Sequence, residues 1–145
     1  MKIFTVIIGV CGMLFFGFNP KEDTSYTILQ QENKELKESM QRGAEVYKDF
    51  CLQCHMATGE GLENVYPPLA KSDFIKKNRE LSIKAIKYGL SEKITVNGNS
   101  YQTPMPDPGL YEEEVRDVAN YIFNSWGNTA KMVTLEEVEA IEKKK

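Results

Sequence analysis

The pentapeptide CLQCH, residues 51–55, contains two of the three cysteines and the only histidine of this 145-residue chain. A structural zinc site needs four Cys or His ligands, and outside the pentapeptide the chain offers only Cys11. A thioredoxin-like dithiol would follow a strand in a βαβ unit, whereas these cysteines follow a helical pattern. A disulfide between Cys51 and Cys54 would leave His55 without a role. Zinc binding, dithiol chemistry and a structural disulfide are therefore weak alternatives.

The pattern Cys-x-x-Cys-His is typical of c-type haem attachment. Two thiols three positions apart can reach both vinyl groups of one porphyrin edge, and the adjacent imidazole can then turn beneath the ring to bind iron. The sequence therefore predicts one haem c per chain, covalently attached through Cys51 and Cys54, with His55 as an iron ligand.

The sixth iron position cannot be filled by a second histidine of this chain, so methionine, which ligates many c-type haems, is the expected partner. The candidates outside the apolar amino terminus are Met40, Met56, Met105 and Met132. Met56 is next to His55 and would lie on the same side of the ring. Met105 is flanked by two prolines in QTPMPDPG, residues 102–109, a stiff loop suited to hold a flexible thioether opposite His55. We predict Met105 as the distal ligand.

Local patterns predict an all-α fold with one small β-hairpin. The expected helices cover residues 39–50 with Ser39 as the amino-terminal cap, 72–78, 79–89, 110–126, and a short helix opened by a capping box of Thr134 and Glu137. The Asn-Gly pair in ITVNGNSY, residues 94–101, favours a type I′ turn between two short strands. Apolar residues expected around the haem are Leu69, Ile83, Ile86, Val96, Tyr101, Val118, Ile122 and Trp126.

Over about residues 40–127 the chain resembles the class I c-type cytochromes, small monohaem electron carriers. The matching positions, besides the pentapeptide, are Gly43, Tyr47, the loop Tyr66-Pro67-Pro68-Leu69, Met105, Val118 and Tyr121. The resemblance implies the cytochrome c fold, with four to five helices around one covalently bound haem. Tyr111 departs from it, because a Ser or Asp cap is commoner at the start of the last family helix.

The resemblance also implies two specific contacts. Gly43 and Tyr47 of the first helix should cross the last family helix near Val118 and Tyr121. The backbone carbonyl of Pro67 should accept a hydrogen bond from the ring N–H of His55 and so fix the imidazole, which makes Pro67 part of the predicted haem site.

The first 18 residues, MKIFTVIIGVCGMLFFGF, place one lysine before a run of mostly apolar residues. The run spans roughly 24 Å as a helix, against ~30 Å for a bilayer core, and small residues at a cleavage site are hard to find. Residues 1–19 are therefore either a signal peptide or a membrane anchor, with residues 3–18 as the possible tether. Because Lys2 should stay inside, both alternatives place the following residues in the periplasm or on the outer face of the cytoplasmic membrane.

The expected domain organisation is a polar linker over residues 20–38, a cytochrome c domain over 39–128 and a helical extension over 129–145. A formal net charge of −3 argues against nucleic acid as a partner. Residues 71–93 contain seven basic and three acidic side chains, whereas residues 107–117 contain five acidic and one basic. This asymmetry indicates either two solvated helix faces or a basic cluster that steers an acidic partner.

We therefore predict a carrier, not an enzyme, that passes electrons between respiratory proteins such as a reductase, a dehydrogenase or a terminal oxidase. Partners would dock around the haem edge, at Gln53, Met56, Ala57 and the residues flanking Met105. One alternative is a haem subunit of a membrane or periplasmic oxidoreductase complex. The other is a haem sensor or enzyme with an open sixth iron position.

Overall fold

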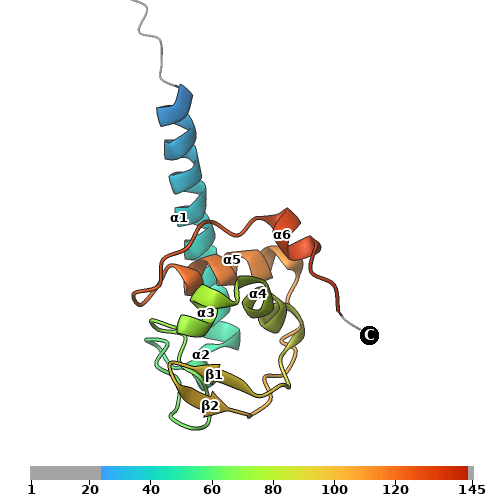
Figure 1. Cartoon of the computed structure of the whole chain (residues 1–145). Coiled ribbons are helices and arrows are strands. Elements are labelled where there is room, and N and C mark those ends of the chain that lie inside the picture. Colours follow the sequence, from blue (N-terminus) through green and yellow to red (C-terminus); the bar gives the residue numbers. More distant parts are fainter. Residues whose placement is uncertain (1–23, 144–145) are drawn as a thin grey trace, which may run out of the picture.

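The computed structural model describes residues 24–143 and consists mainly of helices around one small hairpin (Figure 1). The helices are α1 (Thr24–Phe50), α2 (Leu52–His55), α3 (Asp73–Lys77), α4 (Arg79–Tyr88), α5 (Glu112–Phe123) and α6 (Leu135–Glu139). The strands β1 (Ile94–Val96) and β2 (Asn99–Tyr101) pair antiparallel, with Ile94 opposite Tyr101. The predicted all-α class with a hairpin at residues 94–101 is confirmed.

Helices α1 and α5 form the largest helix pair of the described chain. Gly43 allows their close approach, because a Cβ built there would lie only 2.0 Å from the carbonyl oxygen of Asp117. One turn later the buried ring of Tyr47 lies 5.5 Å from the ring of Tyr121 and 5.0 Å from that of Trp126, measured between centroids. The predicted crossing of the first and last family helices is therefore confirmed.

The predicted start of the first helix at Ser39 is wrong, because α1 begins at Thr24 and runs through most of the expected linker. The added turns are rich in strong helix formers and carry a hydrogen bond of 2.7 Å from the Gln31 amide to Glu35. Ser39 is buried in mid-helix, and its hydroxyl donates a 2.6 Å hydrogen bond to Asp117. In Figure 1 the first half of α1 projects away from the other elements.

The shorter elements begin and turn where their sequence signals predict. The Ser72 hydroxyl accepts a hydrogen bond from the Ile75 N–H at the start of α3, and Thr134 does the same for Glu137 at the start of α6. Asn97 and Gly98 have φ values of 51° and 85°, the positive pair of a type I′ turn. Only α2, a single turn within the CLQCH pentapeptide, was missed among these elements.

Residues 129–143, which we call the C-terminal clasp, return across α4 and α5 and complete the core. Val133 and Val138 are fully buried, and Ile141 is 6% exposed. The side chain of Asn120 in α5 accepts a 2.6 Å hydrogen bond from the Val133 N–H and donates one of 3.0 Å to the Val133 carbonyl. The clasp therefore belongs to the core rather than trailing from it.

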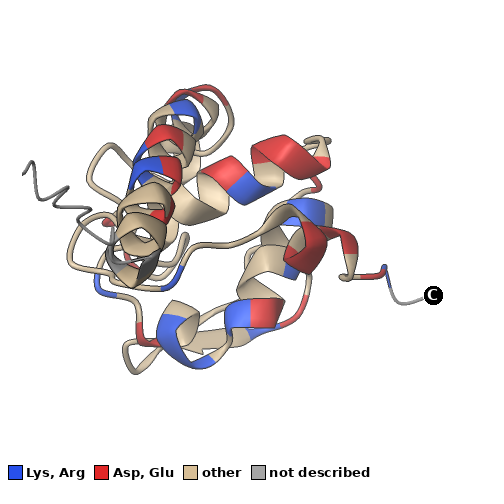
Figure 2. Ribbon diagram, turned by 90° about the horizontal axis from the view of Figure 1, so that it is seen from above, with Lys and Arg blue, Asp and Glu red and all other residues tan. Residues whose placement is uncertain are grey.

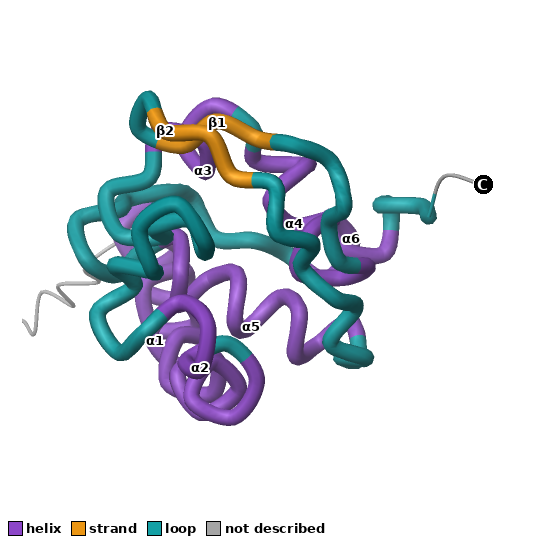
Figure 3. Tube along the Cα trace, turned by 90° about the horizontal axis from the view of Figure 1, so that it is seen from below, coloured by secondary structure: helices purple, strands orange, loops and turns teal. Residues whose placement is uncertain are grey.

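No helix within residues 24–143 is long and apolar enough to span a bilayer. The predicted signal peptide or anchor of residues 1–19 lies outside the described residues. Seen from below, the hairpin β1–β2 and the helix pair α1–α2 lie on opposite sides of the molecule, with loops between them (Figure 3). The residues predicted to form the site converge in this loop region.

Candidate functional site

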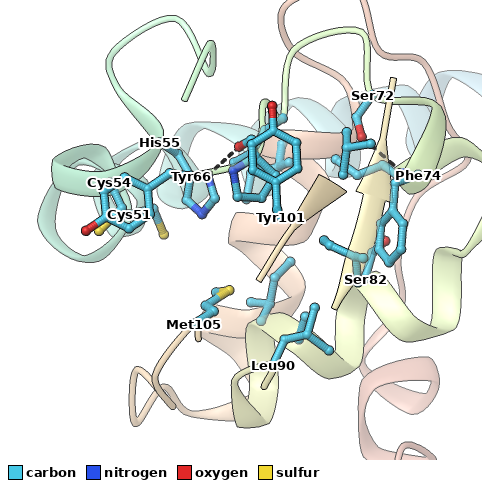
Figure 4. A pocket seen from close by; sticks show the side chains of 18 of the residues that line it. Cys51, Cys54, His55, Tyr66, Ser72, Phe74, Ser82, Leu90, Tyr101 and Met105 are labelled. Atoms are coloured by element: carbon cyan, nitrogen blue, oxygen red, sulfur yellow. Dashed lines mark hydrogen bonds between the residues drawn. The ribbon is translucent and has the colours of Figure 1, made fainter. Parts of the chain in front are cut away.

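The first wall of the site is the helical turn that carries the CLQCH pentapeptide. The Cys51 N–H donates to the Tyr47 carbonyl over 2.9 Å, so α2 follows directly from the end of α1. The His55 N–H then donates to the Cys51 carbonyl, also over 2.9 Å, which closes the turn. Cys51, Cys54 and His55 therefore share one turn, and Figure 4 shows their side chains together at one side of a pocket.

The imidazole of His55 is held in one orientation by Pro67. Its Nδ1 lies 3.0 Å from the Pro67 carbonyl oxygen, as expected, and because a carbonyl can only accept, Nδ1 carries the proton. The lone pair is therefore on Nε2, the atom left to bind a metal. Burial lowers the pKa of His55, with the hydrogen bond to Pro67 acting in the opposite direction, so the ring is neutral at pH 7.

The pKa of the Cys51 thiol is shifted in the direction opposite to that of a redox-active cysteine. Burial and the neighbouring Cys54 raise the pKa of Cys51 to about 11, whereas catalytic thiols have pKa values below the ordinary one. Both cysteines are free and half-buried beside the pocket. The surroundings of the Cys51 thiol therefore disfavour dithiol chemistry.

The second wall is the loop around Met105, which is fixed through its backbone. The Met105 N–H donates to the Leu90 carbonyl over 2.8 Å, and the Leu90 N–H donates back to the Met105 carbonyl over 2.9 Å. Gly89 lies directly against this loop, since a Cβ built there would be 2.6 Å from the Met105 carbonyl oxygen. Figure 4 shows Met105 across the pocket from His55.

The pocket between these walls is lined almost entirely by apolar side chains. Of the eight apolar residues predicted to surround the haem, five line the pocket: Leu69, Ile86, Val96, Tyr101 and Ile122. The other three, Ile83, Val118 and Trp126, do not line it and instead pack in or against the main hydrophobic core. Tyr66 of the family loop also lines the pocket, and the lining residues that sequence analysis missed include Phe74, Ile75, Leu90, Ile94 and Phe123.

The residues of the pocket fit a c-type haem and do not fit a bare metal ion. Within residues 24–143 no group of three or more His, Cys, Asp or Glu side chains could hold a metal. The pocket instead offers two thiols at one edge, an imidazole with a free Nε2 lone pair, a thioether opposite and apolar faces. This set of groups suits a planar macrocycle that brings its own iron.

Comparison with known proteins agrees with this fit. A family model described as cytochrome c matches residues 40–126. The chain is 34% identical over 113 residues to cytochrome c-552 of Thermus thermophilus, a match that covers 71% of this chain and 86% of that protein. The chain belongs to the cytochrome c family. The predicted class I c-type cytochrome domain and its fold are thereby confirmed.

Other relatives of this cytochrome are parts of larger enzymes. The chain is 33% identical over 93 residues to the cytochrome c subunit of the quinone alcohol dehydrogenase of Gluconobacter oxydans, covering 61% of this chain but 19% of that subunit. It is 31% identical over 131 residues to the gluconate 2-dehydrogenase cytochrome c subunit of Pantoea cypripedii, covering 84% of this chain and 30% of that subunit.

Family membership identifies the chemistry of this cytochrome as haem-based electron transfer. Its members carry covalently bound haem c and act as electron carriers or as haem subunits of dehydrogenases, so the expectation of a carrier rather than an enzyme is confirmed. The family match ends at residue 126 and begins at residue 40. The first half of α1 and the clasp therefore lie outside the residues that the family model matches.

Proposed function

We propose that this cytochrome passes single electrons between respiratory proteins through one haem, attached through Cys51 and Cys54 and ligated by His55 and Met105. The observation that carries the proposal is the placement of His55 and Met105 on opposite sides of the pocket, with both cysteines at its edge (Figure 4). Bound haem would supply the one-electron chemistry of its iron.

The protein residues set how readily that iron is reduced. The hydrogen bond from His55 to Pro67 makes the imidazole more electron-rich and fixes its plane. As a ligand, the Met105 thioether would favour reduced iron and so raise the potential. The apolar walls would keep water away from the bound group, which would raise the potential further.

With both His55 and Met105 as ligands, the protein would leave no coordination position of the iron open. A gas or substrate could then bind only by displacing Met105, whose backbone is held by two hydrogen bonds to Leu90. This arrangement supports electron transfer over the haem sensor or enzyme with an open sixth position.

Exposed apolar side chains next to the cysteines offer a surface for brief partner contacts. Phe50 is 54% exposed and Leu52 is 38% exposed, and both lie beside Cys51 in sequence. Gln53 and Ala57, predicted to belong to this surface, are also exposed. Weak and transient redox complexes bury small interfaces of this kind.

The basic cluster of residues 71–93 is smaller on the surface than its sequence suggests. Lys87 is buried and Arg79 is paired with Glu137, so neither side chain is free to steer a partner. Lys71, Lys76 and Lys77 remain exposed. Figure 2 shows basic residues over α3, while the first turn of α5 is acidic, so the molecule has a charge asymmetry that would orient an acidic partner.

The second candidate function is that of a haem subunit in a larger oxidoreductase, as in the dehydrogenase subunits that this chain matches. The first half of α1 and the clasp, both outside the family match, would provide surfaces for such an assembly. Copurification with a larger chain would favour this candidate. In either case we propose an exported protein, in the periplasm or at the outer face of the membrane, on the basis of the residue pattern in 1–19.

Optical spectra of the holoprotein test the ligand assignment. Oxidised wild type should show the weak long-wavelength band that reports an iron–methionine sulfur bond, and haem should stay with the chain after denaturation. Met105→Ala should abolish the band, whereas the matched control Met40→Ala should keep it, because Met40 lies in α1 away from the pocket lining. A wild type without the band that binds carbon monoxide as readily as Met105→Ala would overturn His55/Met105 ligation.

A further inference from the structure

Lys87, in the last turn of α4, is a buried cation that the proposed electron transfer does not use. Its exposed fraction is 9%, which is rare for lysine. The ammonium group donates hydrogen bonds to the carbonyl oxygens of Val138 and Ile141, at 2.9 Å and 3.2 Å, both in the C-terminal clasp. It also lies 3.6 Å from a carboxylate oxygen of Glu112, the first residue of α5. Lys87 therefore joins three segments that are distant in sequence.

The neighbouring tyrosine strengthens the same connection. The Tyr88 hydroxyl donates a 3.1 Å hydrogen bond to the Ile141 carbonyl, the one that Lys87 also uses. The Lys87 ammonium lies 5.2 Å from the centroid of the Tyr88 ring. The end of α4 is thus tied to the clasp by two adjacent side chains.

The next two residues of the chain hold the backbone of Met105. Gly89 lies against the Met105 carbonyl and Leu90 makes two hydrogen bonds with Met105. The clasp, the end of α4 and the loop around Met105, which we call the distal loop, therefore form one continuous series of contacts. Glu112, which follows the same loop in the chain, is the third group near Lys87, so the connection also reaches the end of the loop at which α5 begins.

We propose that Lys87 is a positioning residue for the distal iron ligand. By tying the clasp to the end of α4, it fixes Gly89 and Leu90, and through them the backbone that carries the flexible Met105 thioether. Since methionine has three rotatable side-chain bonds, its sulfur is held in place only as well as its backbone is. This proposal rests on the proposed function, in which Met105 is that ligand.

Arg79, at the opposite end of α4, provides a matched control. Its guanidinium makes two hydrogen bonds to Glu137, at 2.6 Å and 2.8 Å, and donates to the carbonyls of Lys131 and Met132, each at 3.1 Å. It binds the clasp with more hydrogen bonds than Lys87 does but does not adjoin the Met105 loop. Loss of Arg79 should loosen the clasp without moving Met105.

The test compares Lys87→Met, Lys87→Arg and Arg79→Met as holoproteins. In Lys87→Met the long-wavelength methionine band should weaken, the reduction potential should fall, and the affinity of oxidised protein for imidazole should rise about tenfold. Lys87→Arg should restore most of the wild-type behaviour, because guanidinium can donate to both carbonyls. Arg79→Met should unfold at a lower temperature but keep the wild-type band, potential and imidazole affinity. If Lys87→Met does not fold, Tyr88→Phe should shift the same quantities less, in the same direction.

Wild-type imidazole affinity and potential in Lys87→Met, with the methionine band present, would overturn this proposal and leave the proposed function standing. Equal shifts in Lys87→Met and Arg79→Met would also overturn it, because the effect would then be general loosening of the clasp. Absence of the band from wild type would overturn the ligand assignment, and this proposal with it.

Discussion

The two walls of the haem pocket are built in different ways. The His55 wall comes from one stretch of chain, since Cys51, Cys54 and His55 share a helical turn and Pro67 follows within the next loop. The Met105 wall depends on contacts between distant segments, because Leu90 holds the loop and the clasp holds the end of α4. The first wall is made of residues near one another in sequence and is supported by the α1–α5 crossing, whereas the second is held by contacts between segments distant in sequence.

The largest effects on the two walls are expected from two glycine substitutions, one next to the backbone of each wall. Gly61→Ala would place a Cβ 2.4 Å from the Tyr66 carbonyl and 2.7 Å from that of Pro67, and Gly89→Ala would place one 2.6 Å from the Met105 carbonyl. Both glycines have positive φ, 66° and 77°, so each change should cost about 3 kcal/mol of stability.

The two variants should shift the reduction potential in opposite directions. Gly61→Ala displaces the Pro67 carbonyl, which makes the imidazole less electron-rich and raises the potential. Gly89→Ala displaces Met105, the proposed distal ligand, which would weaken a bond that favours reduced iron and lower the potential. Voltammetry of both holoproteins checks this, with Gly98→Ala as the control because nothing lies within 4 Å of a Cβ at that turn position. Shifts of the same sign would contradict the independence of the walls.

A smaller loss of stability than in the glycine variants is expected from removing the charge of Asp117, at the α1–α5 crossing that supports the His55 wall. Burial alone would raise the pKa of Asp117, but hydrogen bonds from Arg42, Ser39 and Arg116 outweigh it and hold the pKa below the usual range. A carboxylate with a depressed folded-state pKa contributes stability above its unfolded pKa of about 3.9 and loses it as the pH falls through the folded value.

Asp117→Asn should therefore lower the free energy of unfolding at pH 7 by about 1–3 kcal/mol, and the difference from wild type should shrink below about pH 4. Denaturant unfolding of the holoprotein at pH 7 and pH 3 measures both quantities. Asp49→Asn is the control, since Asp49 is exposed on α1. A difference that stays constant between the two pH values would contradict the role of the charged carboxylate.

The smallest change in stability is expected from breaking the ion pair by which the clasp contacts the distal loop directly. Lys143 lies 3.5 Å from Asp107, but both side chains are exposed, so the pair should contribute no more than about 0.5 kcal/mol. Asp107→Asn should leave the unfolding temperature and the methionine band of the holoprotein unchanged. A loss of the band in this variant would show that Lys143, not Lys87, connects the clasp to Met105.

Sequence analysis predicted more of the His55 wall than of the Met105 wall. The CLQCH spacing gave the cysteines and His55, and the family resemblance gave the hydrogen bond to Pro67, which lies 12 residues from His55. Two prolines pointed to Met105, yet nothing in the sequence pointed to its backbone partner Leu90. That pairing joins residues from separate segments and leaves no local signal.

The wrong helix start at Ser39 and the unforeseen burial of Lys87 have the same physical origin. Ser39 has the residue type of a helix cap, but its hydroxyl binds Asp117, 78 residues away, so the local pattern gave the wrong helix start. Lys87 belongs to a basic cluster that looks exposed in the sequence, yet the clasp covers it with carbonyl groups more than 50 residues away. Burial by a distant segment decides the role of such side chains, and periodicity within a short window cannot reveal it.

Because α1 is one continuous helix, it fixes both the distance and the orientation of the haem site relative to Thr24. One helix of 27 residues, roughly 40 Å long, runs from Thr24 to the turn that carries the cysteines. Each residue inserted into its projecting half would move the haem edge about 1.5 Å farther from the start of the rod and rotate it by about 100°. The number of residues in that half therefore determines how far the site lies from Thr24 and in which direction it faces.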